Sequence, residues 1–590
     1  MIDLSSTERA IVNSVSSERL MADTKAIARW VRLSGKEEER ESFDYVEGEL
    51  RRMGLETTRH TGAAYVSLPG ATRLSVEDTD VAAITHSMAP GTPEAGLRLP
   101  LVYVGEGTRE HYSSREVRGR IALIDGIAIP GKVLLAEEAG AAACVFANAD
   151  EHVHEMIVST VWGSPTPGTR GLLPRIPVVS VGAAGASTLK EALGESDSPT
   201  AYLRTEVSTG WTEIPTLTAQ ADGPEEPEKF VLFSGHIDSW HHGAMDNGSA
   251  NALMLETLRV LLPHRGAFRR SLRLAFWSGH SHGRYAGSAW YADNFWEDLH
   301  DNCVLHLNAD STGGRGATVV TEGQAMAETR RVAADVVRAL TGEEFNGTRF
   351  GRSGDQSFMS LGVPSLFMFV SEQPPGQDES AGDVAELLGG PGAAGGGVGW
   401  WWHTTEDTAD KIDPDLLARD TSICAAAAYR FLSEMVLPLD VRASAEDLLG
   451  HLRDWRERAG ERFDLSATVS RAEEVAGLAA GLQARLEGAE GEVEPGMARK
   501  LNQAVRRAER GLVRLDYARS DPFDHDPALG QPPVPLLAPV EDLVATEPGS
   551  DASYENLTLL VRRRNRVLHE LSEVRRALND GLEVLGEGSG

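Results

Sequence analysis

The fold is decided by the stretch FVLFSGHIDS at residues 230–239. Its first half is an uncharged apolar run, which predicts a strand that is buried on both faces. Its second half places His236 and Asp238 where that strand would end. Ligands of open α/β sheets bind at the carboxyl ends of the strands, so we expect both side chains to project into a site.

The next segment, MDNGSA at residues 245–250, leads into a helix that its apolar spacing predicts over 250–262. The Asp246 carboxylate could bind a cation there. It could equally cap the N-terminus of the helix, and His236 could be an ordinary polar residue at a strand end. For either residue alone, the plainer structural interpretation is favoured.

Later strands deliver further histidines and aspartates to the same edge. The strand predicted over 272–277 is followed by His280 and His282, the next strand is followed by Asp310, and His403 comes last. Because parallel strands end at one edge of a sheet, these side chains are expected to converge. A mixture of His and Asp ligands suits a borderline cation such as zinc. The convergence is a stronger signal than any one residue.

The chain is long enough for several folded units, because its 590 residues exceed the roughly 100 to 200 of one domain. Short strands between Gly and Pro turns predict a β-rich insert. Strands that alternate with helices over 228–440 predict an α/β fold with a mostly parallel sheet flanked by helices. Helical apolar spacing after residue 438 predicts a C-terminal helical domain. We place the parts at 1–75 (first part of the α/β core), 76–210 (insert), 211–440 (second part of the core, with the site) and 441–590 (helical domain).

The charge balance limits the expected partners. Lys and Arg number 57 against 88 Asp and Glu, which gives a formal net charge of -31. Such a charge repels phosphate backbones and anionic lipid headgroups. Neither nucleic acid nor a membrane surface is therefore an expected partner.

The sequence also predicts a cytoplasmic location. Charged residues interrupt the first 25 positions, so no signal peptide is expected, and no uncharged apolar run reaches the roughly 18 residues of a membrane helix. Cys144, Cys303 and Cys424 form no CxxC pair, which favours a reducing compartment over a disulfide framework.

The motifs around His236, Asp246, Asp310 and His403 resemble, in order and spacing, those of the di-zinc exopeptidases that include bacterial aminopeptidases and glutamate carboxypeptidase. The insert resembles the protease-associated domain of the carboxypeptidase branch, notably in VRGRIALI at 117–124. The helical tail resembles the dimerisation domain of that branch. The resemblance therefore implies a zinc exopeptidase-like core, a protease-associated insert and a homodimer.

The resemblance also implies roles for the converging residues. His236 and Asp310 would bind one metal ion, His403 would bind another, and Asp246 would bridge both. Asp238 would orient His236 and raise its basicity. The implied cofactors are two divalent cations, with zinc favoured and a single metal, manganese or iron as alternatives.

The sequence departs from the family at one place. The family has two consecutive glutamates after the strand at 272–277, one as general base and one as a metal ligand. Counting forward from this strand places the pair on His280 and Ser281, whereas counting back from the following glycine places it on Ser281 and His282. Our hypothesis makes His280 the base and His282 the ligand, because imidazole can do either task. Which of the three residues takes each role stays open.

Two further residues are candidates for contact with substrate. Trp402 stands where the carboxypeptidase branch has a tyrosine that hydrogen-bonds the oxyanion, and it offers only an indole N–H. Arg352 lies in a segment that resembles the substrate-side loop of the family and could clamp a carboxylate. A solvated surface position is the plainer interpretation of Arg352.

We predict a metal-dependent hydrolase that cleaves a peptide or amide bond near a free terminus by metal-activated water. Small peptides or conjugated amino acids are the expected substrates, and amino- and carboxy-terminal release are both open. One alternative is a non-catalytic binding or scaffold relative, which the missing glutamates favour. The other is a metal-dependent cyclase on a similar core.

Overall fold

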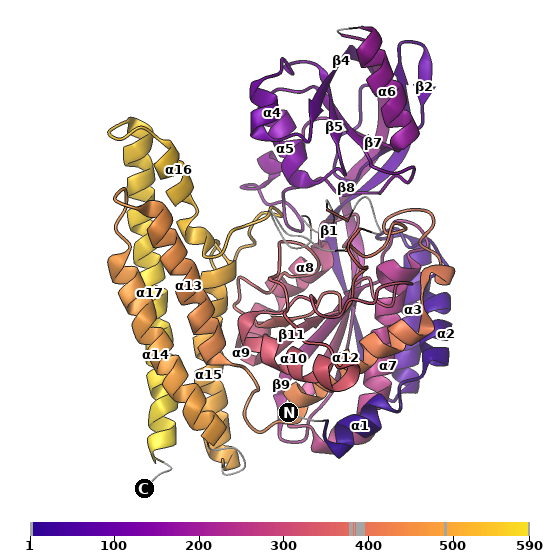
Figure 1. The fold of residues 1–590 in the computed structure, drawn as a ribbon. Coiled ribbons are helices and arrows are strands. Elements are labelled where there is room, and N and C mark those ends of the chain that lie inside the picture. Colours follow the sequence, from indigo (N-terminus) through magenta and orange to yellow (C-terminus); the bar gives the residue numbers. More distant parts are fainter. Residues whose placement is uncertain are drawn as a thin grey trace.

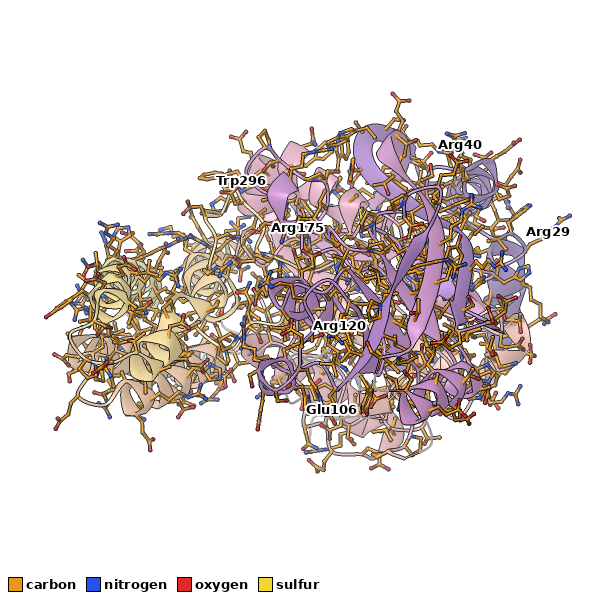
Figure 2. The ribbon with its side chains drawn as sticks, turned by 90° about the horizontal axis from the view of Figure 1, so that it is seen from above. Arg29, Arg40, Glu106, Arg120, Arg175 and Trp296 are labelled. Atoms are coloured by element: carbon orange, nitrogen blue, oxygen red, sulfur yellow. The ribbon has the colours of Figure 1, made fainter. Side chains whose placement is uncertain are left out.

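In the computed structural model (Figure 1), an α/β core carries an inserted domain at one end and a helical bundle at one side. The structure describes residues 4–587 apart from 197, 377–380, 383, 385–386, 388–395 and 489–492. Viewed from the side of the insert (Figure 2), the bundle lies beside the core instead of covering it.

The centre of the core is a set of parallel strands. β9 (Glu226–His236) pairs in parallel with β10 (Arg270–Trp277) and with β11 (Cys303–Asn308). The short β12 (Ser365–Leu366) pairs in parallel with β11. The strand that ends at His236 is therefore central, with a neighbour on each side.

Helices cover both faces of this sheet, as the alternation of buried residues along β9 shows. Phe230 and Leu232 pack with residues of α8 (Ala286–Asn294) and α9 (Trp296–Asn302). Val231 and Phe233 belong to the main core on the other face. The remaining core helices are α1 (Ser6–Val12), α2 (Ser17–Ile27), α3 (Glu37–Arg52), α7 (Ala250–Leu261), α10 (Ala327–Thr341) and α12 (Pro414–Ser433).

Two long antiparallel strands connect the core with the insert. β1 (Thr57–Val76) pairs along most of its length with β8 (Thr200–Ala221). β8 also pairs with β10 of the core and with β4 of the insert. The predicted boundary after residue 210 falls inside β8, so one hydrogen-bonded sheet crosses both parts, and the division into four parts stays a prediction. The other elements of the insert are β2 (Thr79–Val81), β3 (Ile84–Thr85), β4 (Leu97–Gly105), α4 (Arg109–Ser113), β5 (Ile121–Asp125), α5 (Pro130–Glu138), β6 (Ala143–Ala147), β7 (Val178–Val181) and α6 (Ala183–Glu195).

The C-terminal part is a helical bundle, as predicted from its apolar spacing. Its helices are α13 (Val441–Ala459), α14 (Ser466–Gly488), α15 (Pro495–Tyr517), α16 (Pro539–Ala545) and α17 (Asp551–Glu587). Across the described part of the chain, every helix is too short or too polar to cross a membrane. The predicted fold class, an α/β core with a β-rich insert and a helical domain, is confirmed.

Candidate metal centre

Four of the predicted ligands converge beyond the ends of β9 and β11. His236 Nε2 lies 3.1 Å from Asp246 Oδ1 and 3.7 Å from Asp310 Oδ2. His403 Nε2 lies 2.9 Å from the other oxygen of Asp246. Asp246 therefore stands between the two histidines, with one carboxylate oxygen toward each.

These donors fit a divalent cation. His236 Nε2 and Asp246 Oδ1 are buried, and neither makes a well-formed hydrogen bond to any described residue. The two atoms stand 3.1 Å from each other, and a buried pair of donor atoms without a well-formed hydrogen bond is costly unless a ligand lies between them. Two donors on one tetrahedral zinc lie roughly 3.3 Å apart, given metal–ligand distances of about 2.0–2.1 Å, and the pair here is at this spacing.

The surrounding charges keep the centre anionic. Burial disfavours the charged forms of Asp246 and His236, but the neighbouring charged groups outweigh this effect at each residue. The histidines His236 and His403 hold the pKa of Asp246 below its ordinary value. Asp238, Asp246 and Asp310 in turn raise the pKa of His236 well above its ordinary value. Carboxylates that stay ionised in a buried site are a favourable environment for a cation.

Asp238 is buried beside the centre and organises the neighbouring turn. Its carboxylate accepts hydrogen bonds from the backbone N–H groups of His280 at 3.2 Å and Ser281 at 2.8 Å. The ring of His236 is held by the main-chain carbonyl of Asp238, with Nδ1 to O at 2.9 Å. Its carboxylate is farther from that ring nitrogen, at 3.7 Å. Asp238 thus supports His236 mainly through its backbone.

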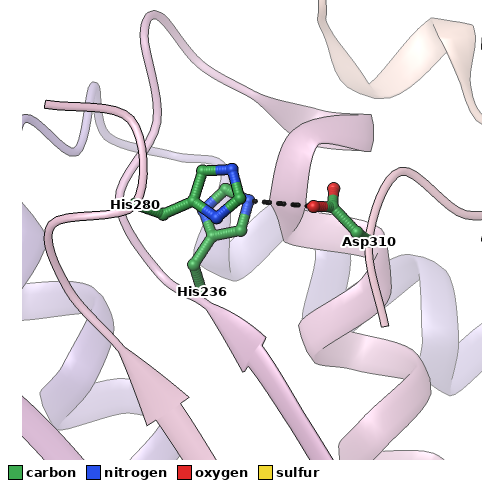
Figure 3. Close-up of side chains that lie close together, drawn as sticks. All are labelled: His236, His280 and Asp310. Atoms are coloured by element: carbon green, nitrogen blue, oxygen red, sulfur yellow. Dashed lines mark ion pairs between the residues drawn. The ribbon is translucent and has the colours of Figure 1, made fainter. Parts of the chain in front are cut away.

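The structure brings His280 into the centre. Its ring stacks on that of His236, with 3.7 Å between the centroids, and Figure 3 shows both rings facing Asp310. His280 Nδ1 lies 2.9 Å from Asp355 Oδ2. Ser288 donates a hydrogen bond to the other oxygen of Asp355. When a carboxylate accepts a hydrogen bond from Nδ1–H of a neutral histidine, Nε2 is the ring nitrogen without a proton.

The structure separates His282 from this group. His282 Nδ1 lies 3.0 Å from Ser34 Oγ, and its ring packs against Trp240. Ser281, and not His282, lines the cavity beside Asp246 and His403. The position of His282 therefore differs from its predicted role as a metal ligand. The physical reason is the capture of the turn by Asp238, which directs the side chains at 280 and 281 inward.

The insert holds the loop that carries His403. His403 Nδ1 lies 2.6 Å from the carbonyl oxygen of Glu155, and the Glu155 N–H donates to the carbonyl of His403. His154 makes a similar contact with the carbonyl of Trp402. The Trp402 ring stacks on His403 and lines the cavity. The insert therefore fixes the orientation of one candidate ligand.

Arg352 lies away from the cavity. Its guanidinium donates to the carbonyl of Asp526 at 2.9 Å and stacks over Trp162, 4.0 Å from the ring centre. Burial lowers the pKa of Arg352 to about 10. This arrangement ties the core to the segment after the third helix of the bundle, and it differs from the predicted role as a carboxylate clamp.

Three residues near the centre escaped the sequence analysis. Asp407 accepts the backbone N–H groups of Met245 and Asp246, at 2.8 and 2.9 Å, and so fixes the bridging loop. Its place in the segment after His403 was a usable signal. The position of Asp355, in the same segment as Arg352, was a weaker signal. Glu155 lies in the insert, where nothing in the sequence points to the site.

A small cavity adjoins the centre, with a volume of about 40 Å³. This space admits a few water molecules or the reacting group of a substrate, but not a peptide chain. Its polar lining consists of Asp246, His280, Ser281, Arg284, Asp310, Ser311 and His403, and its aromatic lining of Trp240, Tyr285, Phe369 and Trp402.

Comparison with known proteins identifies the class. Residues 216–428 match peptidase family M28, and residues 97–189 match the PA domain. All the converging residues lie within the first match, and the second match lies within the insert. The predicted resemblance to the zinc exopeptidases with a protease-associated insert is confirmed.

Relatives support this assignment. The chain is 28% identical to a probable glutamate carboxypeptidase of Zea mays, over 74% of this chain and 69% of that protein. It is 25% identical to a probable glutamate carboxypeptidase of Arabidopsis thaliana, over 70% of this chain and 62% of that one.

Solved structures show the same fold at low identity. A peptidase M28 precursor from Shewanella amazonensis matches with a TM-score of 0.58 and 19% identity, over 73% of this chain and 97% of that one. A zinc aminopeptidase from Bacillus subtilis matches with a TM-score of 0.54 and 20% identity, over 71% and 96%.

Proposed function

We propose that this protein is a metal-dependent hydrolase that cleaves a peptide or amide bond near a free terminus of a small substrate. The observation that carries the proposal is the set of buried, unpaired donor atoms at His236 and Asp246, in a peptidase family M28 domain. The named functions of the relatives, glutamate carboxypeptidase and zinc aminopeptidase, agree with it.

The donors offer two cation positions that share Asp246. We call the first position A, formed by His236, Asp246 and Asp310, and the second position B, formed by Asp246 and His403. Divalent cations in such a site polarise the carbonyl of a substrate and make hydroxide available near neutral pH. Zinc suits the His and Asp donors.

His280 is the proposed general base. Asp355 accepts a hydrogen bond from the Nδ1–H of His280, so Nε2 is available to take a proton within the cavity. The indole of Trp402 and the backbone around the turn supply the polar contacts that orient a substrate carbonyl. Aromatic rings close the rest of the cavity and limit the entry of water.

The decisive experiment incubates the zinc-loaded protein with small peptides and N-acyl amino acids that are free at one end only, and measures product mass. Hydrolysis adds one water to the substrate atoms, whereas cyclisation of an amide loses ammonia. We expect hydrolysis that stops with a chelator and returns with zinc. Failure to convert any substrate, by a protein shown to carry zinc, would count against the proposal. Blocking each terminus in turn decides between amino- and carboxy-terminal release.

We also propose a cytoplasmic homodimer that associates through the helical bundle. Exposed apolar side chains on α16 and α17, namely Val544, Tyr554, Leu559 and Val561, support a contact surface there. The three cysteines are buried and free, which agrees with a reducing compartment. The net charge of -31 supports a small substrate over nucleic acid or a membrane surface. Light scattering that gives the mass of one chain would disprove the dimer.

A further inference from the structure

The two cation positions have unequal sets of donors. Position A has three, the nitrogen of His236 and one oxygen each of Asp246 and Asp310, and the His280 ring stacks on the same side. Position B has one nitrogen from His403 and the second oxygen of Asp246. Four protein donors are typical of a firmly held zinc, and three are the usual minimum of a catalytic site.

Ser281 lies at the cavity that adjoins position B. It lines the cavity together with Asp246 and His403, and its Oγ is buried without a hydrogen-bond partner in the described ranges. Its backbone N–H is fixed by Asp238, so the residue cannot turn away without losing that bond. A hydroxyl is neutral and is not among the usual zinc ligands, which are Cys, His, Asp and Glu.

Charge adds to the difference between the positions. Around position A, the carboxylates of Asp246 and Asp310 face the ion, and Asp355 polarises the neighbouring His280. Around position B, the carboxylate that the described residues place beside His403 is that of Asp246, which position A already shares. A second cation at position B would therefore be attracted by less negative charge, and it would be repelled by the cation already bound at position A.

We infer that the centre holds one divalent cation firmly at position A and a second only weakly at position B, because Ser281 supplies a hydroxyl where a carboxylate is needed. The inference rests on the proposed metal-dependent function and adds to it the order in which the ions bind. Near-neutral activity at low zinc would then come from the singly loaded protein, and free zinc would set the population of the doubly loaded one.

The test is a zinc-binding isotherm of the full-length protein. Metal-free protein is dialysed against zinc at buffered free concentrations, and bound zinc per chain is measured by elemental mass spectrometry. We expect one equivalent at low free zinc, a plateau, and a second equivalent only at a concentration at least tenfold higher. Two equivalents that bind in one step would overturn the inference and leave the proposed function standing. Absence of bound zinc at every concentration would overturn the proposed function as well.

Ser281→Glu is the variant that sharpens the test, because it adds a carboxylate at position B. We expect it to move the second step at least tenfold toward lower free zinc and to leave the first step in place. Ser281→Ala should leave both steps within a few-fold of the parent. If the glutamate leaves the second step where it was, in a protein with unchanged circular dichroism, the inference is wrong.

Two further variants assign the steps. Asp310→Asn keeps the shape of the side chain but replaces an anionic donor of position A by a neutral amide, which should weaken metal binding there at least about tenfold. It should move the first step alone, and it should change the visible spectrum of the Co²⁺-loaded protein, which a merely structural effect would not. His451→Ala removes a second histidine–carboxylate group that could bind zinc, the other one found in the described part of the chain, and both steps should persist in it. If His451→Ala abolishes either step, that step does not report this centre.

Discussion

The metal centre and a second group, formed by Asp447, His451 and Asp516, contain the same residue types. We call this second set the bundle group, because α13 and α15 carry it. At the centre His236, His280 and Asp310 offer atoms within 4.8 Å of one another, and the three residues of the bundle group do the same. In the bundle group, however, His451 Nδ1 lies 2.9 Å from Asp516 Oδ1, and Arg349 forms an ion pair with the other oxygen of Asp516.

The difference between the two lies in how their charges are balanced. Asp516 has a cationic or hydrogen-bonding partner at each oxygen, and Arg349 also donates to its backbone carbonyl at 2.6 Å. In the centre at the sheet edge, by contrast, His236 Nε2 and Asp246 Oδ1 stand 3.1 Å apart beside a cavity, and neither makes a well-formed hydrogen bond to a described residue. The same residues therefore make a closed structural link in one place and an open cation site in the other.

The largest expected effect separates the two groups directly. His236→Ala removes a donor from position A, so the firmly bound zinc should be lost, and hydrolysis should fall by roughly 10³-fold, since a cation contributes several kcal/mol to the transition state. His451→Ala, the matched variant in the bundle group, should keep its zinc and its turnover. Zinc per chain and initial rates of peptide hydrolysis measure both.

The comparison would break if the two variants behaved alike. Equal loss of zinc would mean that the bundle group also binds metal, and equal retention would mean that His236 is not a ligand. Circular dichroism in the presence of chelator distinguishes either result from a loss of the fold.

A second prediction probes the closed link. Arg349→Met keeps part of the apolar stem but removes the guanidinium, which leaves the buried Asp516 carboxylate with His451 alone. Removing one partner of a buried pair typically costs about 3–5 kcal/mol, and the lower end is expected here because the Arg349 side chain is 24% exposed. Denaturant unfolding, followed by the fluorescence of Trp455 in α13 and the other tryptophans, should show the lower midpoint, while zinc content stays that of the parent. An unchanged midpoint would mean that solvent already screens this pair.

The sequence predicted the fold and the convergence at the sheet edge because both follow from local patterns. Apolar runs predict strands, and the residues that follow parallel strands meet at one edge, which placed His236, Asp246, Asp310 and His403 together. The resemblance then gave the insert and the bundle their identity. In these parts of the molecule, the positions of the residues follow from the strands and helices that carry them.

The orientation of single side chains in turns depends on distant partners, and here the structure differs from what the sequence predicted. His282 turns away from the centre because Asp238, far back in the chain, binds the two preceding backbone N–H groups. Arg352 is held by the carbonyl of Asp526, 174 positions later. Glu155 reaches His403 from the insert. No period or spacing encodes contacts of this kind.

The smallest expected effect concerns two buried carboxyl groups close to the bundle group, those of Glu328 and Glu509. Burial first, and then the charges of Asp516 and Asp447, raise the pKa of Glu328 to about 8. Burial and the neighbouring Glu328 raise the pKa of Glu509 as well. Ser444 donates a hydrogen bond to Glu509 at 3.0 Å. Both carboxyl groups therefore favour the protonated state in the folded protein.

The sign of the pH dependence follows from linkage. Since the folded state binds protons that the unfolded state has released above pH 4.5, the free energy of unfolding should fall as the pH rises from about 4.5 to about 8, by at most about 1.4 kcal/mol per pH unit for each proton. Glu509→Gln mimics the protonated acid, so it should flatten this fall and be the more stable protein at pH 8. Thermal unfolding at pH 5, 6.5 and 8 with a chelator present measures the slope, with the exposed Glu494→Gln as control. Parallel slopes in the parent and Glu509→Gln would show that Glu509 is ionised in the folded protein, and that the bundle group leaves less negative charge unbalanced than the raised pKa of Glu328 indicates.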